Sequence, residues 1–388
     1  MNVLYSAVDI KLPDYHGGST HVEEVVKSLI KLKNKVILVI GKNNGQKFHE
    51  KKSNLEIFRL PNFFEKGLLK TINYWVFSSL IFAYIYFFRK IDLVYERARI
   101  FGGTATIIGS YFKKKSILEL NEPVIWVPLI KKDIKKNSFK HKLLKKIFNS
   151  SIKKASLITV THESIKKLLP KNKTIVTDYG ANPQKFNPNI KKAKINFKTE
   201  KNKTFLYSGS FQEWHAINKM LNGFNKAIKV DKKLKLILIG NGPLHEEAKK
   251  FIKKNNLEKN ILLLGKISKN KLPSYINSAD FCFALFDRKY LIFRKFNFFY
   301  SPIKIHEYKS MGKPVIASNF GNLIKIVKNK VNGFLVNEQN TDEIKKVIMK
   351  LVNSKKLVKN IQKNNRKDVL KKYNWNLITK NILSKIEN

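Results

Sequence analysis

Short, continuous apolar runs recur along the chain, and helical stretches separate them. This order is typical of strand–helix–strand units. One such run is Leu236-Ile237-Leu238-Ile239. A strand without polar alternation is buried on both faces, which indicates a parallel sheet with helices on both sides. The sequence therefore predicts an α/β fold built from doubly wound parallel sheets.

The expected strands fall into two groups with a polar, Lys-rich stretch at 187–203 between them. That stretch has little periodicity, so we interpret it as a linker. With 388 residues, the chain suits two domains of ordinary size, at 1–190 and 200–370. The expected strands lie near residues 2–8, 35–40, 55–60, 92–95, 116–120, 156–160, 174–177, 203–208, 234–239, 261–264, 280–284, 314–317 and 334–336.

The chain is strongly basic, with 77 Lys and Arg against 28 Asp and Glu and a formal net charge of +49. The lysines are spread along the chain, as on a solvated surface, and an AT-rich genome could supply much of this bias. A charge this large still creates a strong positive field, which favours an anionic partner such as a lipid surface or a phosphorylated substrate. No specific nucleic-acid partner is expected, because the sequence lacks zinc-finger spacing, an RNP-type strand and basic-region heptads.

Residues 71–88 form a run of 18 residues without a charge, between Lys70 and Arg89. The next expected strand follows too closely for this segment to cross a bilayer and return to the sheet. It is either a buried crossover helix or a helix whose outer face dips into a membrane interface. We expect peripheral attachment to the inner face of the cytoplasmic membrane. Met1 leads directly into the first strand, so no secretory signal is expected, and the single cysteine, Cys282, excludes a disulfide framework within this chain.

Small residues follow several expected strands at their carboxyl ends, where open α/β sheets bind ligands. Glycine lets the backbone approach a ligand closely, and a helix N-terminus offers free N–H groups to an anion. In the first half, Gly17 and Gly18 precede a helix. In the second half, three strands end in turns that suit the floor of a nucleotide site: Ser208-Gly209-Ser210, Gly240-Asn241-Gly242 and Gly265-Lys266-Ile267.

The largest number of candidate functional residues lies in residues 300–318. This stretch predicts a loop, a short helix, a turn and a buried strand. If Ser301-Pro302 starts the helix ahead of Ile303, its N–H groups and Lys304 can meet a diphosphate. Glu307 lies one turn further on the same face, where its carboxylate can accept hydrogen bonds from ribose hydroxyls. The alternative is an ordinary surface ion pair between Lys304 and Glu307.

The 301–317 stretch, with Ser301-Pro302-Ile303-Lys304, Glu307-Tyr308 and Gly312-Lys313-Pro314-Val315, resembles the signature of GT-B retaining glycosyltransferases of family 4 (glycosyl transferases group 1). Further matches cover nearly the whole chain in the expected order. They are Gly17-Gly18, Asp92-Leu93-Val94-Tyr95-Glu96-Arg97, Glu119-Leu120-Asn121-Glu122-Pro123, Tyr179-Gly180-Ala181-Asn182-Pro183, Tyr207-Ser208-Gly209-Ser210-Phe211, Trp214-His215 and Asn332-Gly333-Phe334-Leu335-Val336.

The resemblance implies two Rossmann-like domains facing across a cleft, with a nucleotide-sugar donor on the second and an acceptor on the first. It implies transfer with retention of anomeric configuration, without a metal and without a cofactor beyond the donor substrate. The terminal helix, 373–388, would pack back on the first domain, with Trp375 as an anchor. The predicted catalytic residues are Lys304, His215 and Glu307. The predicted donor ligands are Gly17, Gly18, Ser208, Gly209, Ser210, Gly240, Gly242, Lys266, Ile267, Ser301, Pro302, Ile303, Lys304 and Glu307. The predicted acceptor ligands are His16, His21, Arg97, Arg99, Asn121 and Glu122.

The sequence departs from the family pattern at several positions that bear on activity. Phe299 replaces the first Glu of the family's pair, and Ser210 and His215 replace an Arg and a Lys, which leaves Lys304 as the cation for the diphosphate. Asn121-Glu122 stands where a catalytic histidine is common. The expected activity is hexosyl transfer to a hydroxyl of a glycan or lipid-linked glycan, of the bacterial cell-surface polysaccharide or lipopolysaccharide type. The alternatives are a GT-B nucleotide-sugar epimerase, and a non-catalytic basic membrane or nucleic-acid binder on a degenerate GT-B scaffold.

Overall fold

A computed structural model describes residues 1–61, 63, 67–196 and 202–387. The chain forms two compact units, each with its own sheet and core. Unit 1 comprises Met1–Asp178 and Trp375–Asn388, and unit 2 comprises Tyr179–Asn374. Both are α/β units with parallel sheets, which confirms the predicted fold class of two Rossmann-like domains.

Unit 1 is built on an eight-stranded sheet in the order β3-β4-β2-β1-β5-β6-β7-β8. All neighbouring strands are parallel except the pair β3 and β4. The strands are β1 Asn2–Lys11, β2 Lys35–Gly41, β3 His49–Lys52, β4 Leu55–Leu60, β5 Leu93–Arg97, β6 Lys115–Leu120, β7 Leu157–Val160 and β8 Thr174–Val176.

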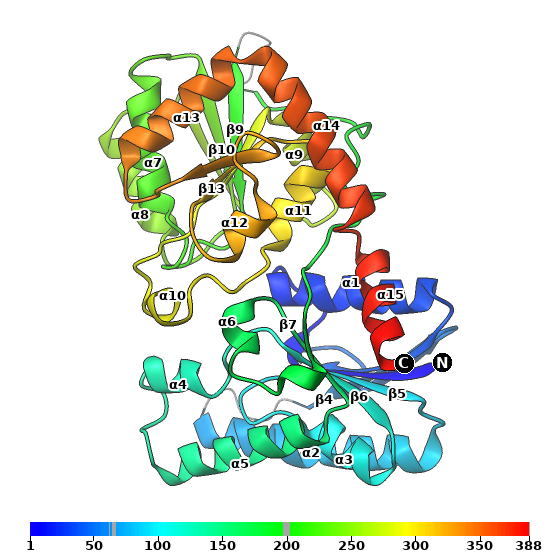
Figure 1. The fold of residues 1–388 in the computed structure, drawn as a ribbon. Helices are drawn as coiled ribbons and strands as arrows, with labels where there is room; N and C mark the ends of the chain where they lie inside the picture. Colours follow the sequence, from blue (N-terminus) through cyan, green and yellow to red (C-terminus); the bar gives the residue numbers. More distant parts are fainter. Residues whose placement is uncertain (62, 64–66, 197–201, 388) are drawn as a thin grey trace. The chain divides into compact units, whose positions relative to one another are not determined.

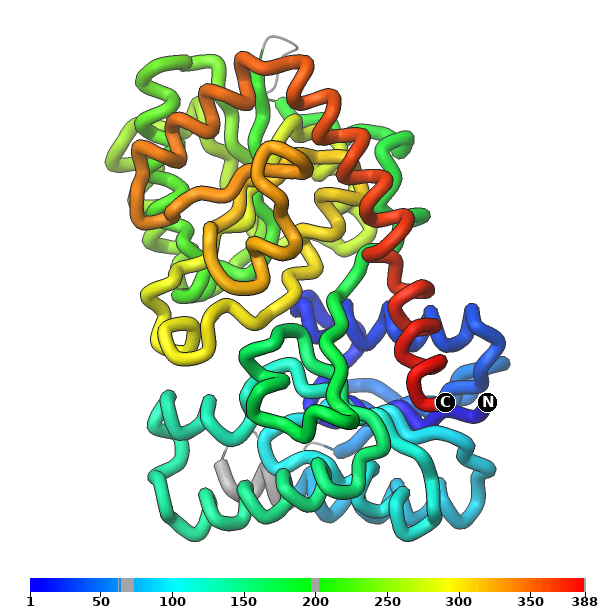
Figure 2. The backbone as a smooth tube through the Cα atoms, viewed as in Figure 1, coloured from blue at the N-terminus to red at the C-terminus, as the bar shows by residue number. Residues whose placement is uncertain are grey.

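Helices cover both faces of this sheet (Figure 1). α2, α3 and α5 form one layer, and α1 and α15 pack together on the opposite face. The tube in Figure 2 shows the same layers. The helices are α1 Gly17–Lys31, α2 Gly67–Phe88, α3 Thr104–Tyr111, α4 Trp126–Ile130, α5 Phe139–Lys154, α6 Glu163–Lys166 and α15 Trp375–Glu387.

Unit 2 is built on a six-stranded parallel sheet in the order β11-β10-β9-β12-β13-β14. Its strands are β9 Lys203–Ser208, β10 Leu234–Ile239, β11 Ile261–Gly265, β12 Phe281–Ala284, β13 Val315–Ser318 and β14 Gly333–Val336. Its helices are α7 Ile217–Ile228, α8 His245–Lys254, α9 Leu272–Ser278, α10 Leu291–Phe296, α11 Ile303–Ser310, α12 Asn322–Ile326, α13 Thr341–Asn353 and α14 Lys355–Lys371.

The apolar periodicity of each helix decides which of its faces is buried. In α7, Ile217, Met220, Leu221 and Phe224 recur at the spacing of one helical face and enter the core of unit 2. The start of α13 is capped by Asn340, whose side chain accepts hydrogen bonds from the backbone N–H groups of Asp342 and Glu343 at 3.1 and 3.2 Å. Burial of one face of α7 and capping of α13 therefore help to hold these two helices, which contact each other, in place.

The units divide at residue 178, earlier than the expected linker at 187–203. The segment after Tyr179 packs on unit 2 although it is polar. The side-chain amide of Asn277 donates to the carbonyls of Pro188 and Ile190 at 3.0 and 2.6 Å. Hydrogen bonds to backbone carbonyls leave no apolar pattern in the sequence, so the sequence did not indicate that this segment belongs to unit 2.

The charge-free segment 71–88 lies within α2, whose Tyr74, Ile81, Phe82 and Ile85 enter the core of unit 1. Among the described residues, no helix is both long enough and apolar enough to cross a membrane. The side of α2 opposite the core carries exposed aromatic and aliphatic side chains.

Candidate functional site

The strand order of unit 2 reverses beside β9, whose neighbours are β10 on one side and β12 on the other. In open α/β sheets, ligands bind outside the carboxyl ends of the strands at such a reversal. The three glycine-containing turns meet there in one hydrogen-bonded layer. Gly209 N donates to the carbonyl of Ile239 at 2.9 Å, and Gly240 N donates to that of Gly265 at 2.7 Å.

The glycines of these turns are required by their backbone conformations. Gly209, Gly240 and Gly242 have φ angles of +145°, +133° and +152°, which disfavour other residues. A Cβ atom at Gly240 would overlap the carbonyl oxygen of Gly209, and one at Gly209 would meet Nζ of Lys304. The turn after β9 is therefore shaped to bring backbone close to Lys304.

The helix that follows this rim, α11, is fixed to β9 by a tyrosine. The hydroxyl of Tyr308 accepts a hydrogen bond from Ser208 N at 2.8 Å and lies 2.9 Å from Ser208 Oγ. Ser301 Oγ accepts a hydrogen bond from Tyr179 N at 2.9 Å just before the helix. α11 thus begins at Ile303, after Ser301-Pro302 as predicted, with its N-terminal turn at the end of the sheet.

Lys304 presents its ammonium group to this rim inside an aromatic enclosure. Its Nζ lies 4.3 Å from the ring centroid of Tyr207 and 5.6 Å from that of Phe286. Part of the side chain is accessible, but Nζ itself is buried and has no hydrogen-bond partner among the described residues. An enclosed cation without a hydrogen-bond partner indicates a site for an anionic group.

Burial lowers the pKa of Lys304 to about 7, although the nearby carboxylate of Glu307 opposes this shift. His215 lies in the same enclosure, with its ring centroid 5.1 Å from that of Phe286. Burial and the charge of Lys304 hold the pKa of His215 well below its usual value. His215 is therefore neutral at pH 7, so it does not replace the charge of the family's Lys.

The other predicted donor residues of unit 2 line the same rim with different exposure. Glu307 is buried on α11, one turn after Lys304. Lys266 is exposed and Ile267 half-buried beyond β11. Phe299, at the position of the family's first Glu, is fully buried and packs on Phe293 and Tyr300, with centroid distances of 6.1 and 4.4 Å.

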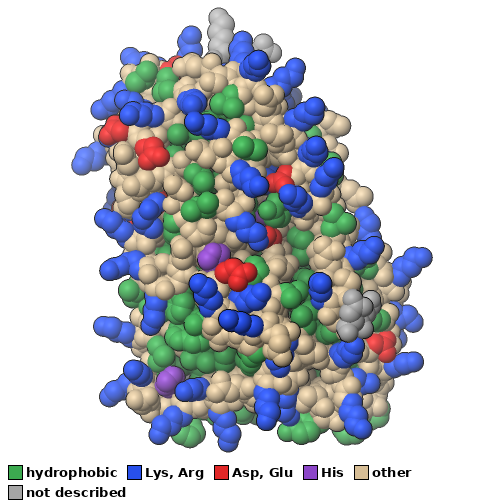
Figure 3. Space-filling model, viewed as in Figure 1, with side chains coloured by type: hydrophobic (Ala, Val, Ile, Leu, Met, Phe, Trp, Pro, Cys, Tyr) green, Lys and Arg blue, Asp and Glu red, His purple; other side chains and the backbone are tan. Residues whose placement is uncertain are grey.

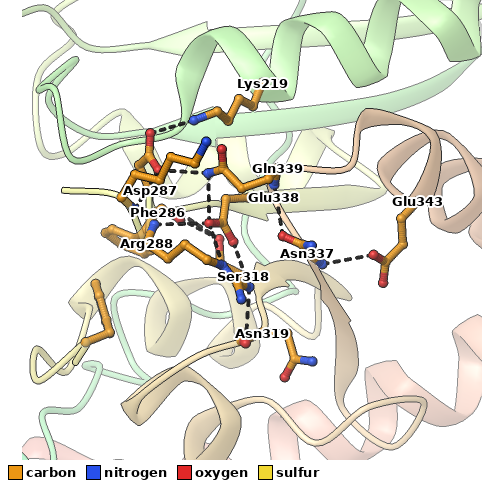
Figure 4. Close-up of polar contacts among 12 residues, drawn as sticks. Lys219, Phe286, Asp287, Arg288, Ser318, Asn319, Asn337, Glu338, Gln339 and Glu343 are labelled. Atoms are coloured by element: carbon orange, nitrogen blue, oxygen red, sulfur yellow. Dashed lines mark hydrogen bonds and ion pairs between the residues drawn. The ribbon is translucent and has the colours of Figure 1, made fainter. Parts of the chain in front are cut away.

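Sequence reasoning missed a polar network that holds the segment around Phe286 (Figure 4). The hydroxyl of Ser318 accepts from Phe286 N at 2.9 Å and donates to Phe286 O at 2.8 Å. Arg288 donates to the fully buried carboxylate of Glu338 through its backbone N–H at 3.0 Å and through Nε at 2.9 Å. These residues lie at or just beyond the ends of β12, β13 and β14. The one sequence signal for this network is that each of its residues follows or ends a predicted strand.

The corresponding edge of unit 1 brings Gly18 and Arg97 together beside β1 and β5. The helix α1 begins at Gly17, so Gly17 and Gly18 form its first turn and do not precede it as predicted; His16 takes the extended backbone of the capping residue. A Cβ atom at Gly18 would lie 3.0 Å from Ile10 Cδ1 and 3.5 Å from a guanidinium nitrogen of Arg97. Gly18 is thus tightly enclosed, whereas no atom of the described residues lies within 4 Å of a Cβ at Gly17.

His21 and Asn121 enter a buried network around Glu119. His21 Nε2 lies 2.8 Å from one carboxylate oxygen, and Asn121 and Tyr95 donate to the carboxylate at 2.7 and 2.9 Å. Burial raises the pKa of Glu119, but His21 and these hydrogen bonds outweigh it and lower the pKa to about 2. The ring of His21 also packs edge-on against Trp375, which anchors α15. The structure gives His21 and Asn121 partners within unit 1, and an acceptor role for them stays a prediction.

The remaining predicted acceptor residues lie at different places on unit 1. Arg97 donates to Asp9 at 2.7 Å near Gly18. Arg99 turns to α2, where its guanidinium lies 4.6 Å from the ring centroid of Tyr74 in a small pocket. Burial raises the pKa of Glu122, against the charge of Arg97. His16 is mostly exposed, 3.8 Å from Asp14.

No group of three or more His, Cys, Asp or Glu side chains suited to a metal ion occurs among residues 1–61, 63, 67–196 and 202–387. Charge on a bound phosphate at the rim of unit 2 can be met by Lys304, by the N–H groups of α11 and by the turn after β9. That arrangement can stabilise a phosphate leaving group.

The sequence is similar to those of known glycosyltransferases. Residues 188–368 match the family model of glycosyl transferases group 1. The chain is 23% identical to the uncharacterized glycosyltransferase MJ1069 of Methanocaldococcus jannaschii, over 94% of this chain and 93% of that protein. It is 31% identical to MJ1178 of the same organism over 36% of each chain.

Solved structures with low sequence identity share the fold. The chain is similar to a sucrose-phosphate synthase from Thermosynechococcus elongatus, with a TM-score of 0.74 and 15% identity, over 99% of this chain and 98% of that one. It is also similar to Anabaena Alr3699/HepE in complex with UDP, with a TM-score of 0.69 and 14% identity over the whole of both chains. WaaG, a glycosyltransferase involved in lipopolysaccharide biosynthesis, gives a TM-score of 0.71 and 10% identity over 99% of each chain.

Proposed function

Because residues 188–368 match the family model of glycosyl transferases group 1 and the chain has the GT-B fold, we propose that it is a glycosyltransferase of this group that uses a nucleotide-sugar donor and retains its anomeric configuration. The acceptor is a hydroxyl of a glycan or a lipid-linked glycan. The reaction needs no metal ion. UDP and UDP-glucose bound to the Anabaena neighbour support a nucleotide sugar as the donor.

The observation that carries the proposal is the buried ammonium of Lys304 at the carboxyl end of β9, which has no hydrogen-bond partner among the residues that the structure describes. We assign the donor diphosphate to Lys304, to the N-terminal turn of α11 and to the turn Ser208-Gly209-Ser210. Glu307 holds the ribose hydroxyls. A bound diphosphate would give this ammonium charge-assisted hydrogen bonds in addition to the attraction of the nearby Glu307 carboxylate.

The proposed chemistry follows from the leaving group. The acceptor oxygen forms a bond to the anomeric carbon while the bond from that carbon to the diphosphate oxygen breaks. Negative charge then develops on the diphosphate, where Lys304 and the backbone N–H groups stabilise it. A phosphate oxygen of the donor takes the proton of the acceptor hydroxyl on the same face, so the configuration is retained and no protein base is needed.

The proposed acceptor and the proposed location of the enzyme are supported by the net charge of the chain and by the exposed apolar side of α2. In the view of Figure 3, Lys and Arg side chains are spread over the surface, and acidic side chains are few. A net charge of +49 attracts an anionic membrane surface. We place the enzyme at the inner face of the cytoplasmic membrane, where a lipid-linked glycan of the polysaccharide or lipopolysaccharide type would be extended.

A thermal-shift screen with UDP, GDP, ADP and CDP tests the donor site, because a bound ligand raises the apparent stability. At least one nucleotide should raise Tm, and Glu307→Ala should weaken its binding and turnover at least tenfold. Glu258→Ala, an exposed residue after α8, is the matched control and should behave as the unmodified protein. No affinity for any nucleoside diphosphate would instead support a degenerate, non-catalytic scaffold.

Product analysis tests the reaction itself. Incubation of the best donor with acceptor should yield a glycoside of the donor's own anomeric configuration by NMR, and EDTA should leave the rate unchanged. Inverted product or complete loss of activity with EDTA would overturn the corresponding part of the proposal. An epimerised nucleotide sugar formed without any acceptor would favour a GT-B epimerase.

A further inference from the structure

One face of unit 1 is formed by three helices without a carboxylate side chain. α2, α3 and α5 contain no Asp or Glu, and they lie side by side in one layer (Figures 1 and 2). α3 contacts both of the other helices. The solvent side of α2, α3 and α5 is called the outer face of this layer. In this face, α2 supplies apolar side chains and α5 supplies positive charge.

The outer side of α2 is an aromatic and aliphatic stripe. Val76, Leu80, Tyr84 and Phe87 are exposed at 49, 61, 43 and 72%. Their spacing of three to four residues places them on one helical face, opposite the residues in the core. Phe87 packs on Phe112, just after α3, at 5.5 Å between ring centroids, so the stripe continues from α2 to its neighbour.

The outer side of α5 is a lysine stripe. Lys142, Lys145, Lys146 and Lys153 lie on the solvent side of α5 and recur at helical spacing. Between the two stripes, Tyr111 at the end of α3 is three-quarters exposed, and Nζ of Lys154 lies 3.5 Å from its ring centroid. The apolar and basic groups thus meet at the ends of the three helices.

This composition fits a membrane interface better than water or a protein partner. A row of exposed large apolar side chains on one helix is unusual on a monomer and indicates an interaction surface. Tyr and Phe insert at the level of lipid headgroups, while lysines bind anionic headgroups and extend their aliphatic stems along the apolar layer. Because these three helices carry no carboxylate side chain, none of them repels an anionic bilayer.

We infer that the outer face of α2, α3 and α5 docks on a bilayer that contains anionic phospholipid. The α2 stripe enters the interface, and the α5 lysines contact headgroup phosphates. This inference deepens the proposed membrane location and rests on it, but it concerns a face at which no donor residue is placed. Its test uses vesicles without any sugar donor, so failure of the docking leaves the donor-binding proposal standing.

Co-sedimentation with vesicles of phosphatidylcholine, with and without phosphatidylglycerol, measures the docking. The protein should bind the anionic vesicles, and binding should fall with salt. Replacing Lys142, Lys145, Lys146 and Lys153 with Gln should weaken it by about fivefold per lysine. The matched control replaces four lysines of α14 (Lys356, Lys359, Lys363 and Lys367) and removes the same charge from unit 2. Equal loss in both variants would mean attraction by net charge alone and would overturn the inference.

Two further variants test the apolar stripe. Leu80→Ser with Phe87→Ser should abolish the part of vesicle binding that survives high salt, with unchanged circular dichroism and unchanged nucleotide thermal shift. Leu80→Trp should add tryptophan fluorescence that brominated lipid quenches. If brominated lipid left this added fluorescence unquenched, or if the serine variant bound vesicles as the unmodified protein does, the inference would be overturned. A dimer in solution that the two serines dissociate would overturn it as well.

Discussion

At the scale of single residues, the environment of Lys304 could be predicted only in part. The spacing from Ser301 to Glu307 identified the residue and its helix. The sequence did not indicate that Tyr207 and Phe286, far apart in the chain, would enclose its ammonium. Such an enclosure depends on which strands become neighbours, here β9 and β12. The lowered pKa of Lys304 is therefore a property of the fold.

Lys304→Met should raise the stability of the ligand-free protein and lower its affinity for nucleotide. Methionine keeps much of the length and the apolar character of the side chain but removes a buried cation whose solvation is unfavourable. The ligand-free protein should become more stable, with Tm raised by about 2–4 °C per kcal/mol gained, while nucleotide affinity falls at least tenfold. Differential scanning fluorimetry with and without nucleotide measures both. A less stable variant with normal affinity would contradict the assigned role.

Donor affinity should depend on pH through the same group. The free protein holds Lys304 at a pKa of about 7, and a bound diphosphate would raise that value because the two charges attract. Above pH 7 binding must take up a proton, so affinity should weaken by up to about tenfold per pH unit between about pH 7.5 and 9. Calorimetry with a nucleotide sugar in two buffers of different ionisation enthalpy measures this uptake. Lys304→Met should abolish it, and proton release on binding would contradict the prediction.

At the scale of elements, every expected strand is present, because buried parallel strands are continuous apolar runs. The sequence analysis missed β3, whose residues His49-Glu50-Lys51-Lys52 are polar and pair with β4 at the edge of the sheet. Edge strands often carry charge, which blocks pairing with another chain. The polar network around Phe286 was also missed, since Ser318 and Glu338 reveal their partners only once β12, β13 and β14 are aligned.

Ser318 should act on the donor site through Phe286. Ser318→Ala removes both hydrogen bonds to the Phe286 backbone, which should loosen this wall of the enclosure and let water reach Lys304. The pKa of Lys304 should then rise towards its ordinary value, and the weakening of donor affinity should begin at a higher pH. Ser318→Thr keeps the hydroxyl and should restore the original profile. An affinity that falls equally at all pH values would indicate general damage instead.

At the scale of the whole molecule, the chain passes between its units twice, after residue 178 and after residue 374. The second crossing places α15 in unit 1, where it packs on α1. The donor residues predicted on the β9 rim and α11 all lie in unit 2, whereas the exposed outer face of α2, α3 and α5 lies in unit 1. A substitution in the core of unit 1 is therefore made outside the unit that holds these donor residues.

Trp375→Ala should destabilise unit 1 while leaving donor binding by unit 2 intact. The indole is buried at the start of α15 and packs on His21 of α1 at 5.2 Å between ring centroids. Its loss from a core costs about 3–5 kcal/mol, which lowers the Tm of a unit of this size by roughly 6–20 °C. Calorimetry should show one early transition, and nucleotide should still stabilise the later one. Leu377→Ala, at a more exposed position of α15, is the control and should change little. A single transition that moves as a whole would mean that the two units unfold together.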